Sequence, residues 1–358
     1  MSKDQSEGGT CIGIIANPVS ARDIRRIVAN ASNLQTSERV SIVLRVLSTL
    51  ASVGVKRVLM MPDKGGISSM LLRSLKRDKG PRHRYPEVEF VDIPVTSTVH
   101  DTFAATRKMQ HTGVRAIIVL GGDGTHRAVV RELLEGTRRG ANAVPIAGLS
   151  TGTNNAFPEM REPTVAALAV GLYAVGKIAP VEALSQNKIL EISIAGKRRD
   201  IAIVDAVIAS DRFIGSRALW KTESLSAVYL AFADPQVIGL SAIGGLLHPV
   251  GRKEAGGLAV YLSRNASECR LYLKAPIAPG MVSEVGIAGW KSMSGDEEFT
   301  VALESGVVAL DGEREMTFDE GEKVLVVLRE NAFQTVDVER CMHLAARTGI
   351  FRQSTAIS

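Results

Sequence analysis

One acidic side chain lies within a run of glycines that could bind phosphate. Gly121-Gly122-Asp123-Gly124-Thr125 follows a short apolar segment and precedes a segment with helical spacing. Glycines let backbone N–H groups approach phosphate oxygens closely, and the start of a helix favours anions. A carboxylate there would repel a phosphate, so Asp123 needs either a cation between the two or a hydroxyl group whose proton it accepts. Magnesium-dependent phosphoryl transfer to an alcohol meets both requirements.

Two other loops carry polar residues directly after apolar segments. Residues 17–20 (NPVS) follow the apolar run that begins at residue 11, and residues 150–155 (STGTNN) follow AVPIAGL. Ligands of an open parallel sheet bind at the carboxyl ends of its strands. We therefore expect the three loops to bind one nucleotide and Asp123 to orient or deprotonate the acceptor hydroxyl. The predicted nucleotide-binding residues are Asn17, Pro18, Ser20, Gly121, Gly122, Gly124, Thr125, Thr151, Gly152, Thr153, Asn154 and Asn155.

The glycine run also has a simpler interpretation, as a tight turn in which Asp123 or Thr125 caps a helix. Three compatible loops favour the functional interpretation. Other phosphate motifs are missing, since the sequence has no GxxxxGK[ST] and no GxGxxG after the first predicted strand. His126 follows Thr125 directly, and it would either reach a phosphate or face solvent in the first helical turn.

The first half of the chain alternates strand-like and helix-like segments, which predicts a parallel sheet covered on both faces. The second half, after about residue 180, has many short strand-like runs without helices between them, including a hairpin around Gly196-Lys197. This pattern is typical of a β-rich domain, either a sandwich or a partly closed barrel. A helix at 163–176 would link the halves. The expected strands of the first half are 11–17, 55–62, 88–94, 115–120 and 143–149, and the expected helices are 37–54, 67–77, 97–113 and 126–136.

Composition limits the function classes. The formal charge is +5, from 43 basic and 38 acidic residues, and a basic run lies at 76–85. A solvated connection explains that run better than a nucleic-acid site, because only one aromatic is interleaved. No apolar run approaches the roughly 20 residues that span a bilayer. The polar start and the three scattered cysteines favour a cytoplasmic protein that binds neither membrane nor nucleic acid.

The motifs together carry a family resemblance. GGDGT after a strand resembles the hallmark of the superfamily of ATP-NAD kinases, diacylglycerol kinases and sphingosine kinases. Residues 17–20 are similar to the NPxSG loop of its lipid-kinase branch, and residues 152–157 resemble that branch's GTGNDF, with Ala156 where an aspartate is usual. Asp311-Gly312-Glu313 resembles its DGE, whose glutamate is a candidate base. By itself, Asp-Gly at 311–312 is also ordinary hairpin-turn chemistry.

The second half is also similar to NAD kinases. Residues 201–209 resemble a segment that aligns Asp205 with the acidic residue contacting substrate NAD, although Val204 replaces an asparagine there. An ordinary ion pair is an equal alternative for Asp205. The family's substrate stretch TDGWxxSTPTGSTAY is replaced by an unrelated sequence from about residue 210. Within the superfamily, the length, the amino-terminal sequence and the TGTNNAFP loop are most like acetoin-catabolism X proteins.

The resemblance implies an α/β, Rossmann-like domain with a parallel sheet over residues 1–160 and a β-sandwich-like, all-β substrate domain over residues 161–336. Residues 337–358 would pack back on the first domain. It implies ATP and Mg²⁺ as cofactors and NAD as the leading acceptor. Glu313 would join Asp123 as a catalytic residue, with Asp205 and Asp311 binding the acceptor. A homo-oligomer, dimer or tetramer, and contacts with acetoin dehydrogenase components are also implied.

Two alternatives remain open. A non-catalytic nucleotide sensor or accessory protein of a dehydrogenase system would bind ATP or NAD without turnover, and the altered acceptor region favours it. A lipid-type kinase is indicated by NPVS and DGE, and it would need an apolar groove between the domains.

Overall fold

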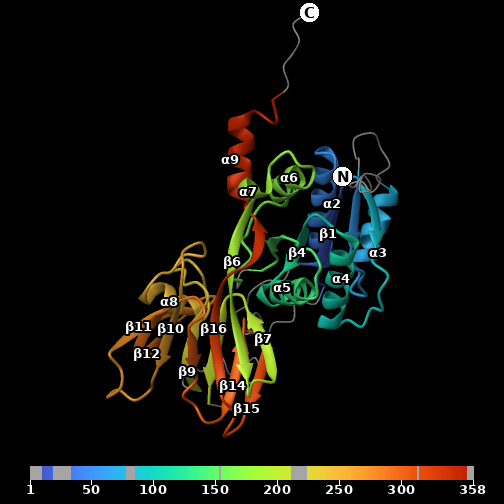
Figure 1. Ribbon diagram of the computed structural model, residues 1–358. Coiled ribbons are helices and arrows are strands. Elements are labelled where there is room, and N and C mark those ends of the chain that lie inside the picture. The colour runs from blue at the N-terminus through green and yellow to red at the C-terminus, as the bar shows by residue number, and fades with distance from the viewer. Residues whose placement is uncertain are drawn as a thin grey trace, which may run out of the picture.

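Five parallel strands alternating with helices form the first half of the molecule (Figure 1). The computed structural model describes residues 10–18, 34–77, 85–152, 155–210, 224–312 and 314–352. The strands lie in the order β3-β2-β1-β4-β5, all paired in parallel, which confirms the predicted sheet. Their bounds are β1 Cys11–Ala16, β2 Arg57–Met60, β3 Glu87–Phe90, β4 Ile117–Gly121 and β5 Ile146–Ser150, with helices α2 Thr36–Ser52, α3 Ile67–Arg77, α4 Val99–Thr112 and α5 Asp123–Arg138.

Helices cover both faces of this sheet because successive strand side chains point in opposite directions. In β1, Ile12 and Ile14 pack with residues of α2 and α3 in one hydrophobic cluster. Ile15 faces the other way and packs with residues of α4 and α5 in a second cluster. All three isoleucines are fully buried. The apolar runs of the sequence therefore correspond to strands that are buried on both faces.

Strands from the second half extend the same sheet beyond β5. β16 (Val324–Val336) pairs in parallel with β5 and antiparallel with β6 (Leu184–Ile194), and β6 pairs with β7 (Arg198–Ala202). With β13 (Glu298–Thr300) on β16, the sheet has nine strands and is mixed. The β6–β7 hairpin confirms the turn predicted at residues 196–197. The sheet thus crosses the domain boundary predicted near residue 160. Local periodicity could not reveal this, because it carries no signal of pairing between distant segments.

A second, seven-stranded sheet has the order β11-β12-β10-β9-β8-β14-β15. One face packs on helix α8, through Ile243. The other face shares a hydrophobic cluster with the nine-stranded sheet, in which Tyr229 and Val308 accompany Ile192 and Ile201. Sequence analysis did not predict α8 in its glycine-rich segment. The bounds are β8 Asp205–Ala209, β9 Leu225–Leu230, α8 Ser241–Leu247, β10 Gly257–Leu262, β11 Leu271–Ala278, β12 Met281–Met293, β14 Gly306–Leu310 and β15 Arg314–Phe318.

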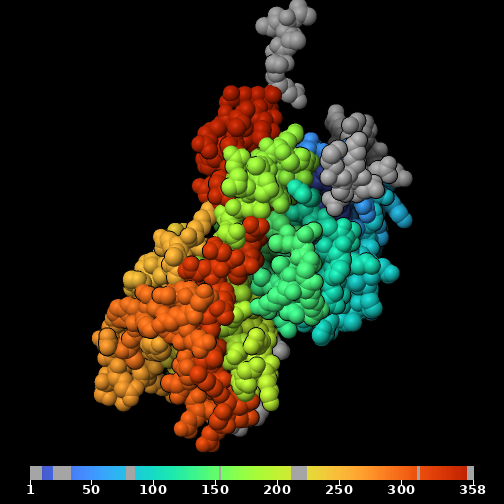
Figure 2. All heavy atoms as spheres, in the orientation of Figure 1, coloured from blue at the N-terminus to red at the C-terminus, as the bar shows by residue number. Residues whose placement is uncertain are grey.

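The last described helix lies against the helices that link the two halves. α9 (Val338–Thr348) contacts α6 (Pro163–Ala174) and α7 (Pro180–Ala183), and its Cys341 and Ala345 are fully buried in the cluster that contains β1 and α2. In Figure 2 the red atoms of α9 lie beside the green atoms of the segment that contains α6. The helix predicted at 163–176 is α6. Within the described residues, no helix is both long and apolar enough to cross a membrane.

His126 anchors α5 beneath the glycine-rich turn. Its ring is fully buried, its Nδ1 donates to the carbonyl oxygen of Gly122 at 2.8 Å, and it packs on Phe157 with ring centroids 5.7 Å apart. Gly148 makes room for the ring, because a Cβ at that position would lie 2.8 Å from Nε2. His126 therefore neither faces solvent nor reaches out to a phosphate. Burial lowers its pKa to about 4.

The second sheet should tolerate an added methyl group at one glycine and not at another. A Cβ at Gly306 would lie 2.3 Å from the carbonyl oxygen of Ala209, whereas one at Gly289 would meet nothing within 4 Å. We expect Gly306→Ala to lower the free energy of unfolding by about 1–3 kcal/mol, because backbone must move. Gly289→Ala is the control and should be neutral or slightly stabilising. Equal effects in chemical denaturation would contradict the packing described for β14.

Acid should destabilise the protein through His126. Its pKa is near 6.5 when unfolded and about 4 when folded, so the unfolded chain binds the proton first as the pH falls. The stability that depends on neutral His126 is fully present above pH 6.5 and is lost toward pH 4, by roughly 3 kcal/mol in total. Denaturation of His126→Gln at several pH values should show a shallower decline than the wild type. An equally steep decline in the two proteins would contradict the burial of a neutral His126.

Candidate active site

Three of the predicted loops meet at the carboxyl edge of the parallel sheet. The Asn17 side-chain amide donates to the Thr125 hydroxyl at 3.0 Å, which joins the loop after β1 to the start of α5. Asn155 lies against Gly122, where a Cβ would be 2.8 Å from its Oδ1. Asn155 also donates to Ser150 Oγ at 2.8 Å. The loops after β1, β4 and β5 therefore form one surface.

The glycines of the central loop permit this close packing. A Cβ at Gly121 would lie 2.6 Å from the Cβ of Thr125, and Gly122 is the N-cap residue of α5. The first N–H groups of a helix have no partner within the helix, and its dipole favours an anion at this end. The start of α5, beside Asn17 and Asn155, is thus suited to phosphate oxygens.

A fourth loop at this edge was missed by sequence reasoning. Residues 63–66 follow β2, and a Cβ at Gly65 would lie 2.4 Å from the Cβ of Pro18. The Asp63 carboxylate accepts hydrogen bonds from the N–H groups of Ile67 and Ser68, at 3.1 and 2.7 Å, and so caps α3. The sequence signal was DKGG directly after an apolar run. In the structure Lys64 is exposed in this loop.

A buried arginine at the same edge was also missed. Arg39 in α2 is only 3% exposed, and its Nη1 donates to the carbonyl oxygen of Asn17 at 2.7 Å. Its helical spacing from Val43 and Val46 places a cation on the apolar face of the helix, and that was the available signal. Arg39 brings a positive charge to the backbone of the loop after β1.

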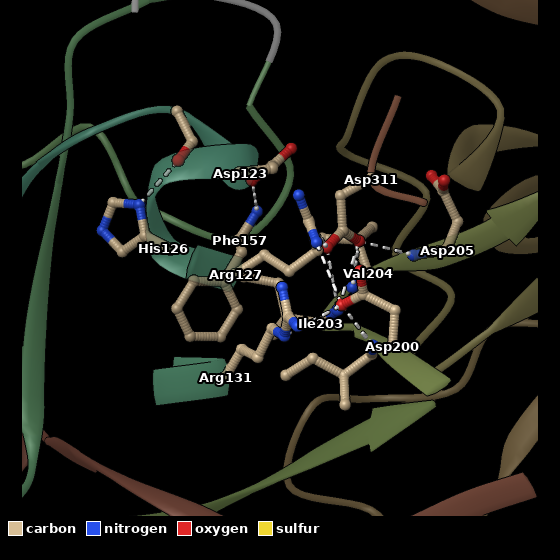
Figure 3. A network of polar contacts seen from close by, with 12 residues as sticks. Asp123, His126, Arg127, Arg131, Phe157, Asp200, Ile203, Val204, Asp205 and Asp311 are labelled. Carbon is tan, nitrogen blue, oxygen red and sulfur yellow. Dashed lines mark hydrogen bonds and ion pairs between the residues drawn. The ribbon is translucent and has the colours of Figure 1, made fainter. Parts of the chain in front are cut away.

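Asp123 is held by the loop after β5. Its Oδ1 accepts from the N–H of Phe157 at 2.8 Å and its Oδ2 from the N–H of Ala156 at 2.9 Å. The side chain is half-buried at the first position of α5. Figure 3 shows it near Arg127, which lies one turn further along α5, and near Asp311, which comes from the second half. Its orientation is therefore fixed by backbone donors.

Asp311 is enclosed by backbone donors of the second half. Its carboxylate accepts from the N–H groups of residues 203, 204 and 205 at 2.8 to 3.2 Å, and its side chain has no exposure. Arg127 Nε lies 3.8 Å from Asp311 Oδ2, and Arg127 Nη1 donates to Asp200 at 3.3 Å. Burial is the main cause that raises the pKa of Asp311, and the negative charge of Asp205 raises it further. The positive charge of Arg127 acts in the opposite direction. Asp123 adds to the rise, so Asp311 lies close enough to interact with each of the other two carboxylates.

The structure thus brings together most of the predicted site residues that it describes. Asp205 is half-buried at the start of β8, and its own N–H donates to Asp311 at 3.1 Å. The predicted residues Ser20, Thr153, Asn154 and Glu313 lie outside the described residues. So do residues 211–223, which are part of the sequence at 210–237 that stands in place of the family's substrate stretch. The catalytic, nucleotide-binding and acceptor-binding roles stay predictions. At the carboxyl edge of the parallel sheet lie Asn17, Pro18, Gly121, Gly122, Asp123, Gly124, Thr125, Thr151, Gly152 and Asn155.

Comparison with known proteins agrees with this architecture. Residues 12–178 match the family model of the ATP-NAD kinase N-terminal domain, and residues 188–331 match that of the acetoin catabolism protein X C-terminal domain. A crystal structure of a diacylglycerol kinase from Bacillus anthracis str. Sterne aligns with 93% of this chain and 98% of its own, at 12% identity and a TM-score of 0.45. Structural similarity at that level carries no argument for either fold or function.

A curated relative gives the family. Over 345 residues the chain is 56% identical to acetoin catabolism protein X of Cupriavidus necator (strain ATCC 17699 / DSM 428 / KCTC 22496 / NCIMB 10442 / H16 / Stanier 337). The alignment covers 95% of this chain and 94% of the relative. The chain therefore belongs to the acetoin catabolism protein X family, with an amino-terminal half of the ATP-NAD kinase type.

Proposed function

We propose that this protein transfers a phosphoryl group from ATP to a hydroxyl acceptor, with NAD as the leading acceptor. The observation that carries the proposal is the position of Asp123. It lies at the start of α5, among loops suited to phosphates, and close to Asp311 of the second half, whose carboxylate also interacts with that of Asp205. A nucleotide at the loops and an acceptor on the side of Asp205 would both be within the reach of one carboxylate.

The residues divide into donor and acceptor sides. The start of α5, the loop after β1 with Arg39 behind it, and the loop after β5 bind the nucleotide phosphates. Asp123 accepts the proton of the attacking hydroxyl, and its fixed orientation aims one carboxylate at that group. Asp205 contacts the acceptor. Glu313 is proposed as a second base, although it lies outside the described residues.

Magnesium fits this site as a partner of the nucleotide. Within the described residues, no group of three or more His, Cys, Asp and Glu side chains is arranged to hold a metal. Mg²⁺ in nucleotide enzymes needs only one or two carboxylates, since substrate phosphates and water complete its shell. Asp205 would supply such a carboxylate, which leaves Asp123 as the proton acceptor. The ion would neutralise charge that develops on the phosphates.

The remaining family features are extended to this chain as proposals. We regard the facing arrangement of the two sheets as a β-sandwich-like substrate domain. The name of the relative places that protein in acetoin catabolism, and we propose the same setting here, with acetoin dehydrogenase components as partners of a homo-oligomer. The lipid-kinase alternative needs an apolar groove. The cavity of about 780 Å³ between α5 and strands β6, β7 and β16 has mixed walls, in which Arg131, Arg138 and Arg329 accompany apolar side chains such as Leu134 and Ile192.

The proposal is tested by incubating the protein with Mg-ATP and NAD and measuring NADP. Asp123→Asn removes the proton acceptor but keeps an oxygen for one backbone N–H, so we expect a loss of about 10²- to 10⁴-fold in rate with the fold retained. Asp92→Asn is the matched control, because Asp92 is exposed at the same edge of the sheet after β3. Full activity in Asp123→Asn would sink the mechanism.

A nucleotide sensor is a second candidate, favoured by the two backbone N–H groups that already occupy the Asp123 carboxylate. In this case Asp123 would hold the loops together rather than take a proton. Calorimetry should then show saturable binding of ATP or NAD while no NADP forms under the same conditions. Product formation by the wild type excludes the sensor, and an absence of both binding and product excludes both functions.

A further inference from the structure

Arg252 reaches from the second half to the segment that holds Asp123. It lies between α8 and β10, and its Nη1 donates to the carbonyl oxygen of Phe157 at 2.5 Å. Its Nη2 donates to the carbonyl oxygen of Ala156. The N–H groups of these same two residues donate to Asp123. Residues 156–157 are therefore bound on one side by a cation and on the other by a carboxylate.

One peptide group joins the two charges directly. The carbonyl of Ala156 and the N–H of Phe157 belong to the same peptide unit. That unit accepts from Arg252 and donates to Asp123 Oδ1. Hydrogen bonds in such a chain polarise one another, so a positive charge at the carbonyl end strengthens the N–H donor at the other end. Arg252 thus acts on Asp123 through a single rigid group.

The Arg252 guanidinium is itself held in place. It lies over the ring of Phe232, 4.6 Å from its centroid, and over that of Phe157 at 5.7 Å. Burial lowers the pKa of Arg252, while the negative charges of Glu159 and then Asp123 oppose the shift. Only the planar, forked guanidinium offers two parallel donors to neighbouring carbonyls while stacked on aromatic rings.

A buried lysine holds the loop that carries Arg252. Lys188 Nζ donates to the carbonyl oxygens of Gly251, Glu254 and Gly256, at 3.1, 2.7 and 2.6 Å. These three bonds use all three donors of the ammonium group. Lys188 lies on β6, in the nine-stranded sheet. Lys188 therefore fixes the loop of Arg252 relative to the same sheet that carries the glycine-rich loop.

We propose that Arg252 is a positioning residue that sets the orientation of Asp123 through the 156–157 segment. Its effect on turnover rests on the proposed phosphoryl transfer, whereas its hold on the segment does not. Arg252 touches neither nucleotide nor acceptor in this scheme. The second half of the chain thereby controls the geometry of a carboxylate that belongs to the first.

Three variants test the proposal: Arg252→Met removes charge and donors, Arg252→Lys keeps the charge without the fork, and Lys253→Met is the matched control. Lys253 is the next residue, and it pairs with Asp337 at 2.6 Å rather than with residues 156–157. The first measurement is hydrogen exchange at the N–H groups of Ala156 and Phe157. We expect exchange to be faster by roughly tenfold or more in Arg252→Met, intermediate in Arg252→Lys and unchanged in Lys253→Met.

The second measurement is steady-state kinetics with Mg-ATP and NAD. Misplacement of a reacting group lowers the rate of the chemical step. We therefore expect kcat to fall by about 10- to 100-fold in Arg252→Met, with a smaller change in KM for ATP. Arg252→Lys should restore part of kcat. If the Met variant does not fold, the Lys variant carries both measurements.

The outcomes separate this inference from the proposed function. Unchanged exchange at residues 156–157 in the Arg252 variants overturns the positioning role, whatever the kinetics. Faster exchange with unchanged kcat overturns its catalytic consequence. If the wild type makes no NADP, the NAD assignment fails, and hydrogen exchange still decides whether Arg252 holds the segment beside Asp123. Faster exchange together with the selective loss of kcat supports the proposal.

Discussion

Two hydrogen bonds, from the N–H groups of Ala156 and Phe157 to the Asp123 carboxylate, fix the site on which every proposed function depends. Asp123 begins α5, so these bonds hold the start of that helix against the loop after β5. The contact of Asn155 with Gly122 and the bond from Asn17 to Thr125 then close the surface around it. Backbone donors are well suited to this task, because they cannot rotate away as side chains do.

This arrangement concentrates negative charge at the boundary between the halves. Asp311 interacts there with both Asp123 and Asp205, and an unpaired buried carboxylate would be strongly destabilising. The protein compensates at Asp311 with backbone N–H groups and with Arg127, which also contacts Asp200. Asp311 therefore holds the start of β8 against the end of β14. Asp123 and Asp205 are only half-buried, so their side chains stay partly accessible.

The two halves are joined by a continuous sheet rather than by a flexible linker. β16 lies between β5 and β6, so the strands of the parallel sheet continue into those that face the second sheet. Arg252 adds polar contacts across the same boundary, and Lys188 on β6 holds the loop that carries Arg252. A site assembled in this way would keep the proposed donor and acceptor sides in a constant relation, as transfer between two bound molecules requires.

The sequence by itself determined the parallel half, the β6–β7 hairpin and the loops at the carboxyl edge, because hydrophobic period and turn residues are local properties. It also contained the family resemblance that the comparison confirmed. Only the tertiary structure decided that β16 joins the first sheet, that Asp311 turns to backbone N–H groups, and that Arg252 reaches Ala156 and Phe157. Each of these depends on pairing between residues more than 90 positions apart, for which neighbouring residues carry no periodic signal.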